Sequence, residues 1–322
     1  MFSRVLPTAL KRSPQQTDVV GRPRPLQAVL AWELRRFAAS RIFWLQALGL
    51  FCFMVLLTLA QATLDQYSKP TASAFIPGTS AWGLLVTLPP TLVLLVVLLP
   101  FVTADGVARD LQRRTHELVM STALPSWAYV WGRYLSGLLM SLGLAVALLA
   151  AILGVGMALH LTDTGYPAPE LSAVLVLWGG MVVPATVLVG SVSFALVTLF
   201  PRLSTIGKIV ILVAWVVGAV VLPTVIYLPS GPTSLPTGYS AWDPTSALTA
   251  LTLLQRYQPN IDPQSAAVMS TVQFQSFINT IANQAPDAST WLAPHLVEAG
   301  LSLVLVAVAA LGFRRFSHPF GA

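Results

Sequence analysis

The sequence has 322 residues, of which 55% are hydrophobic and 9% charged, with a formal net charge of +6. A soluble domain carries about 25% charged residues, so this composition excludes an ordinary soluble protein and predicts a polytopic membrane protein. The basic balance does not indicate nucleic-acid binding, because the charges flank apolar segments, where they set membrane topology. Cys52 is the single cysteine, which excludes an intramolecular disulfide and a cysteine-based metal site.

The N-terminal part is basic and then becomes amphipathic. Residues 1–25 contain arginines, a lysine and prolines but lack the apolar core of a signal peptide, which predicts a flexible cytoplasmic tail. Residues 26–41 place apolar side chains on one helical face and Glu33, Arg35 and Arg36 largely on the other. This pattern predicts an interfacial helix lying on the membrane, which includes Trp32 and has Phe37 on its apolar face; the alternative is an ordinary start to the first span.

Residues 42–322 are predicted to form a six-span transmembrane domain. Each apolar segment is long enough to cross the roughly 30 Å of bilayer hydrocarbon, and the segments are 43–62, 81–104, 129–159, 171–200, 206–228 and 294–313. Prolines within the second segment predict a kink, and they are Pro89, Pro90 and Pro100. Small residues in the third segment predict close helix packing, and they are Ser136, Gly137, Ser141 and Gly143.

The connection 229–293 is too long to be structureless in a compact protein. Asp243-Pro244 and Asp262-Pro263 each place a capping acid before a proline, which predicts helices over 245–256 and 264–283. Orientation follows from the basic residues. Of the 18 lysines and arginines, all but Lys69 and Arg256 fall on one side of the predicted spans. Both termini are therefore expected in the cytoplasm, and 229–293 outside, as two helices over the mouth of a pathway.

Within the chain, away from its termini, charged residues of both signs cluster in one segment, between Asp105 and Arg133. Its helical spacing predicts a short amphipathic helix in water that ends at Pro125, with Asp105 paired to Arg109 and with Arg133 at the headgroup layer. The charged residues are Asp105, Arg109, Asp110, Arg113, Arg114, Glu117 and Arg133.

This stretch, RRTHELVMSTALPSWAYVWGRYLSGLL, followed by a long apolar helix, resembles the first cytoplasmic loop of ABC-2 type permeases, the membrane subunits of one class of ATP-driven exporters. The family pattern is approximately acid-x-x-Gly-Thr-x-Glu-Leu-Leu, then Ser-Thr-Pro, then Gly-Lys or Gly-Arg. Arg114 replaces the usual glycine, and the proline comes later, at Pro125. The residues that match are Thr115, Glu117, Leu118, Ser121, Thr122, Gly132 and Arg133.

The resemblance implies an all-α ABC-2 (type V exporter-like) fold in the plasma membrane, working as a homodimer or heterodimer of permease subunits. It implies export of a hydrophobic or amphipathic substrate, energised by a separate ATP-binding subunit docked on the loop 105–128. ATP and magnesium would then be bound by that partner. The implied coupling residues are Arg113, Arg114, Thr115, His116, Glu117, Leu118, Ser121 and Thr122.

The residues themselves offer little catalytic chemistry. The sequence lacks a Gly-x-x-x-x-Gly-Lys-[Ser/Thr] loop, so the chain is not expected to hydrolyse ATP, and its dispersed histidines disfavour a metal site. Glu298 is the one acid drawn into an apolar run. It is either an intramembrane polar site for an ion or substrate, or an interfacial acid hydrated from outside.

Two other function classes stay open. A secondary transporter would need ionisable residues near the middle of the membrane and often an internal repeat, and neither is evident in the sequence. A non-transporting membrane scaffold is the third possibility. An ATPase that co-purifies from native membranes would favour the permease over both.

Overall fold

The computed structural model describes residues 24–62, 65–69, 72–112, 124–163, 165–227, 237–256 and 267–316. Within these ranges, six helical segments are long and apolar enough to cross a membrane, which confirms the prediction of a helical polytopic membrane protein. The segments agree with the predicted spans to within a few residues at each end, and they are Arg41–Ala60, Ala81–Ala104, Ser126–Thr162, Leu171–Leu199, Pro201–Val225 and Leu292–Phe313.

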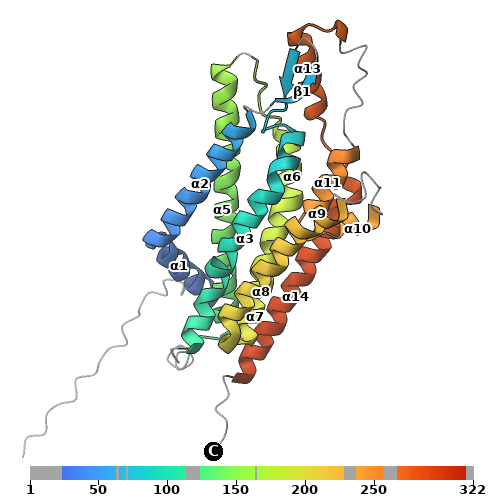
Figure 1. Ribbon diagram of the computed structural model, residues 1–322. Coiled ribbons are helices and arrows are strands. Elements are labelled where there is room, and N and C mark those ends of the chain that lie inside the picture. The colour runs from blue at the N-terminus through green and yellow to red at the C-terminus, as the bar shows by residue number, and fades with distance from the viewer. Residues whose placement is uncertain are drawn as a thin grey trace, which may run out of the picture.

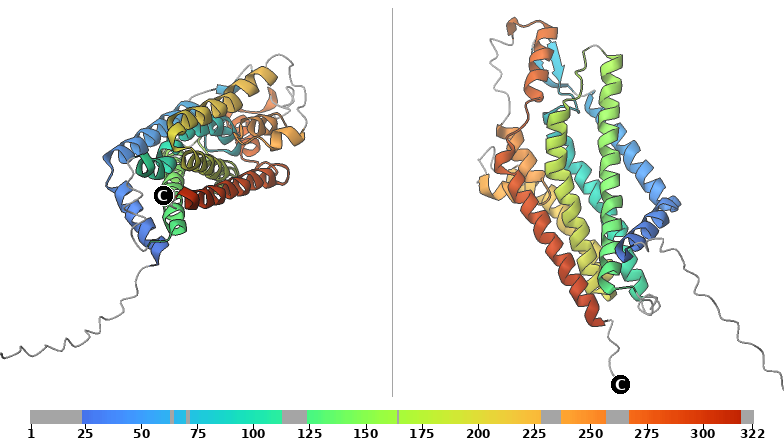
Figure 2. Two further views of the ribbon diagram at one scale, coloured as in Figure 1. Left: turned by 90° about the horizontal axis from the view of Figure 1, so that it is seen from below. Right: turned by 180° about the vertical axis from the view of Figure 1, so that it is seen from behind.

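The spans form one bundle, with α1 beside one end and a β-hairpin at the other (Figure 1). The end of the bundle beside α1 is called the α1 end below, and the opposite one the hairpin end. The two views of Figure 2 show α14 running along one side of the bundle and α2 along another. The helices at and between these ends are α1 (Pro25–Ala38), α2 (Arg41–Ala62), α3 (Ala81–Gln112), α5 (Ser126–Thr162) and α14 (Leu292–Phe316).

Helix α3 lies in the middle of the bundle and contributes many of its fully buried side chains, among them Leu84, Leu92 and Leu99. The three prolines for which a kink is predicted lie inside this helix, which is continuous from Ala81 to Gln112. Beyond the apolar part, α3 continues to Gln112. The charged stretch thus begins as an extension of the second span, and Pro125 stands at the N-cap of α5.

The fourth and fifth spans each contain a π-helical turn. The fourth consists of α6 (Leu171–Leu177), η1 (Trp178–Val182) and α7 (Val183–Leu199), and the fifth of α8 (Ser204–Val216), η3 (Val217–Val221) and α9 (Leu222–Tyr227) after the short turn η2 (Pro201–Leu203). Such turns insert an extra residue and are frequent at functional sites. In η1, a Cβ on Gly180 would lie 2.5 Å from Cζ3 of Trp291, so this glycine lets the tryptophan ring approach the backbone.

The connection between the fifth and sixth spans contains helices, as predicted, and two of them fall within the predicted ranges 245–256 and 264–283, of which 264–266 lie outside the described residues. The elements of this connection are α10 (Thr237–Ala241), α11 (Ala247–Arg256), α13 (Thr271–Ala282) and the turn η4 (Ala288–Thr290). Asp262 lies outside the described residues. Ser270 is the N-cap of α13, and Gln273 completes a capping box. This Ser-x-x-Gln pattern is a start signal, but the sequence prediction relied on Asp262-Pro263 instead.

The sequence did not predict the antiparallel hairpin of β1 (Asp65–Lys69) and β2 (Ala72–Phe75). Its register pairs Asp65 with Phe75 and Lys69 with Ala72. The side-chain amide of Gln275 on α13 bonds both backbone groups of Phe75, accepting from N at 3.1 Å and donating to O at 2.9 Å. A two-stranded hairpin is marginal alone, so α13 stabilises it through this pairing.

Of the small residues in the third span, Gly137 lies at a helix contact. A Cβ on Gly137 would lie 2.8 Å from Cα of Thr103 on α3, whereas a Cβ on Gly143 would meet no atom of the described residues within 4 Å. Ser136 and Ser141 are buried and donate to carbonyls of their own helix. Close packing is therefore confirmed for Gly137, and it is wrong for Gly143 within this chain.

The pair Gly137→Ala and Gly143→Ala tests this packing. We expect Gly137→Ala to lower the free energy of unfolding by about 1–3 kcal/mol, because the new methyl group forces α5 away from α3. Gly143→Ala should leave it unchanged or slightly higher, since alanine favours helix. Unfolding of the purified protein in mixed micelles, followed by circular dichroism, measures both. Equal stability of the two variants would contradict the packing argument.

Candidate functional site

A network of charged side chains joins three helices at the α1 end. Nη1 of Arg133 on α5 lies 2.6 Å from Oε1 of Glu33 on α1, and Nη2 of Arg133 contacts Oδ2 of Asp110 near the end of α3. Glu33 also pairs with Arg36 at 3.0 Å. Tyr129 donates a hydrogen bond to the same oxygen of Asp110. We call Glu33, Arg36, Asp110, Tyr129 and Arg133 the ionic network.

The network is largely removed from solvent. The side chains of Glu33 and Arg133 are only 1% and 5% exposed, whereas Asp110 and Arg36 are 18% and 34% exposed. The network contains two cations, Arg36 and Arg133, and two carboxylates, Glu33 and Asp110. Their charges sum to zero, so the buried charges of Glu33 and Arg133 are compensated within the network. The contact between Nη1 and Oε1 is an ion pair without an aligned hydrogen bond, which leaves Coulomb attraction as its main stabilising interaction.

Aromatic rings complete the surroundings of Arg133. Its guanidinium carbon lies 5.2 Å from the ring centroid of Trp32 and 5.2 Å from that of Tyr129, distances typical of cation–π attraction. Arg36 approaches the ring of Trp32 at 5.8 Å. Trp32 itself is 56% exposed. Helix α1 is thus held to α5 by ionic and aromatic contacts together.

The structure corrects the predicted faces of α1. Glu33 was expected on the polar face with Arg35 and Arg36, but it is the buried residue of this helix. The reason is Arg133, which is buried in α5 and needs an anion. A Cβ on Gly132 would lie 2.6 Å from Cγ1 of Val29, so this glycine lets α1 approach closely enough. Arg133 is enclosed between helices, and its position at the headgroup layer stays a prediction.

The predicted coupling residues Arg113 to Thr122 lie outside the described residues, and so do the side chains of Asp105 and Arg109, whose pairing stays a prediction. The structure does describe both flanks. Helix α3 ends at Gln112 and α5 begins at Ser126, and each carries members of the ionic network close to those ends. The network therefore lies where the chain leaves one helix for the loop and enters the next.

At the other end of the molecule, Glu298 is half-buried on α14, close enough to Asp243 to interact electrostatically. Its neighbour His295 is buried, with Nδ1 2.8 Å from the carbonyl oxygen of Trp291 and Nε2 3.1 Å from Oγ of Ser246. Since a carbonyl only accepts, Nδ1 carries the proton, and in the neutral form of the ring Nε2 accepts from Ser246. Sequence reasoning missed Ser246, which carries no local signal of this contact.

Among the described residues, no group of three or more histidine, cysteine, aspartate or glutamate side chains could hold a metal ion. No match to the chain is found among protein-family models or curated proteins. The class defined by the structure is therefore a multi-pass helical membrane protein, with an ionic network at the α1 end.

Proposed function

We propose that this chain is the membrane-spanning subunit of an ABC-2 type transporter, driven by a separate ATP-binding subunit that docks on the loop 105–128. The resemblance of residues 105–133 to the first cytoplasmic loop of that family suggests it. The six candidate spans and the helix that precedes them agree with it. In this proposal the chain works as a dimer and exports a hydrophobic or amphipathic substrate, and the α1 end faces the cytoplasm.

The ionic network is the observation that best supports the proposal. ATP hydrolysis in one chain can move another only through packed contacts whose energy differs between two states. Asp110 and Arg133 lie at the two helix ends from which the loop departs, and Glu33 extends their contact to α1. A push on the loop would thereby reach the second and third spans and the interfacial helix as one unit.

Affinity purification from native membranes tests the proposal. The tagged chain, extracted in a mild detergent, should retain an ATPase of the ABC type, and the purified complex should hydrolyse ATP. A chain that transports its substrate down an ion gradient without any nucleotide would instead be a secondary transporter. Retention of partners with neither activity would identify a scaffold, and either result would overturn the proposal.

A further inference from the structure

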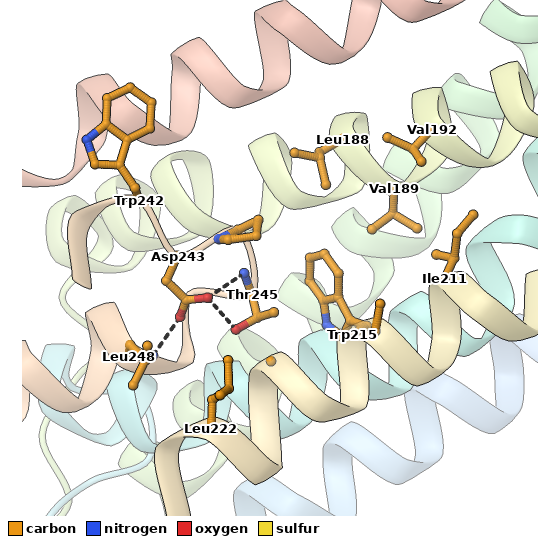
Figure 3. A pocket seen from close by; sticks show the side chains of 13 residues that line it. Leu188, Val189, Val192, Ile211, Trp215, Leu222, Trp242, Asp243, Thr245 and Leu248 are labelled. Atoms are coloured by element: carbon orange, nitrogen blue, oxygen red, sulfur yellow. Dashed lines mark hydrogen bonds between the residues drawn. The ribbon is translucent and has the colours of Figure 1, made fainter. Parts of the chain in front are cut away.

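An apolar cavity of about 370 Å³ lies between the fourth and fifth spans, beneath the turn that precedes α11. Figure 3 shows Leu188, Val189 and Val192 of α7 on one side of it, and Ile211 and Trp215 of α8 on the other. Its size falls within the roughly 300–1,000 Å³ of small-molecule sites. Trp242 and Leu222 in its wall are 51% and 36% exposed, so the cavity reaches the surface of the bundle.

The polar groups in the wall define which ligands fit. Among the described residues no basic side chain lines the cavity, and Asp243 is its acid. The carboxylate of Asp243 is already occupied, because Oδ1 accepts from N and Oγ1 of Thr245 and Oδ2 from N of Leu248. An anionic group would meet this carboxylate without a counter-charge, and a cationic group would meet a carboxylate whose oxygens already accept three hydrogen bonds. The cavity therefore favours an uncharged apolar ligand.

An unsatisfied hydrogen-bond donor at Trp215 indicates that the ligand carries an acceptor group as well as a hydrocarbon chain. Trp215 is 5% exposed, and its Nε1 has no hydrogen-bond partner among the described residues. Three other tryptophans share this feature, Trp82, Trp178 and Trp291, but Trp215 is the one that lines this cavity. Buried N–H groups without a partner are uncommon in folded proteins. A ligand that brings a hydrogen-bond acceptor to Trp215 would satisfy it.

The backbone around the cavity is specialised on two sides. Gly218, in the wall, belongs to the π-helical turn η3, and a Cβ there would lie 2.8 Å from Cγ2 of Thr245. Ser246, next to Thr245, has a φ of 60°, the one positive φ of a non-glycine residue in the described ranges. Both conformations concentrate at functional sites. His295 holds the strained turn in place through the hydroxyl of Ser246.

We propose that this cavity binds the hydrocarbon chain of an uncharged acyl ester, with the ester carbonyl accepting a hydrogen bond from Nε1 of Trp215. Binding itself does not depend on the partner ATPase. The inference that the bound lipid is also the transported substrate rests on the proposed function. In that case the substrate class is neutral single-chain lipids.

The test is photolabelling of the purified chain in phosphatidylcholine nanodiscs, without any ATPase. The probe is a monoacylglycerol with a diazirine in its acyl chain, and labelled peptides are mapped by mass spectrometry. Labels should concentrate on Leu188 to Val192 and Ile211 to Leu222. Ala214→Phe fills the cavity, and because even two displaced methylene groups are worth about tenfold in affinity, it should lower this labelling about tenfold.

Val213→Phe is the matched control, since Val213 is 55% exposed and does not line the cavity. Val192→Phe fills the cavity from the opposite wall, so a folding defect in one variant does not decide the test. Equal labelling in wild type and both cavity-filling variants would overturn the site. Equal labelling by the corresponding free fatty acid would overturn the neutral headgroup. Neither result bears on whether an ATPase docks on the loop.

Discussion

Arg133→Gln is expected to lower the free energy of unfolding by about 3 kcal/mol, near the lower end for a broken buried ion pair. The variant removes from Glu33, which is 1% exposed, the buried one of its two described cations and leaves the partly exposed Arg36. It also removes the cation that holds Asp110. Unfolding in mixed micelles with increasing denaturing detergent, followed by circular dichroism, measures the loss.

Two further variants make this expectation specific. Glu33→Gln combined with Arg133→Gln should recover part of the stability, because the most deeply buried carboxylate is then removed together with its cation, whereas Asp110 still lacks Arg133. Arg35→Gln is the control, since Arg35 is exposed on the same helix, and it should change stability by less than about 0.5 kcal/mol. If Arg133→Gln were as stable as Arg35→Gln, the network would not hold α1 to the bundle.

The second large effect is expected at Leu118, within the predicted docking loop and outside the described residues. If Leu118 anchors the ATPase in a groove, Leu118→Asp buries an unpaired charge there and costs several kcal/mol, or more than about 100-fold in affinity. If the loop only fixes topology, the change has little effect. ATPase binding and substrate-stimulated hydrolysis in a reconstituted complex distinguish the two.

Val268→Asp is the matched control, because Val268 is 87% exposed. The substitution introduces the same charge, but in the connection between the fifth and sixth spans. It should leave ATPase binding unchanged. Glu117→Lys should weaken coupling, and an acid at the facing position of the partner should restore it. Wild-type coupling in both Leu118→Asp and Glu117→Lys, with normal membrane insertion, would remove the basis of the proposed function.

The positions of the spans could be predicted because they depend on segment length and hydropathy, which are local properties. That α3 runs on from Ala104 into the charged stretch could not, because charged residues give no hydropathy signal that joins their helix to the span before it. The start of α13 was readable in the Ser270 and Gln273 capping box. The hairpin was not, because short strands depend on contacts such as that of Gln275, far away in sequence.

The candidate sites, like the hairpin, could not be predicted, because they depend on contacts between residues that are far apart in the sequence. Composition and periodicity by themselves determined a six-span helical membrane protein with an amphipathic helix before it and a charged loop after the second span. Which face of α1 meets α5 is decided by packing, and that contact turned Glu33 from a surface acid into the buried partner of Arg133. The cavity beside Trp215 likewise arises only where two spans and a distant turn meet, because a one-dimensional pattern specifies how each helix is buried but not what it is buried against.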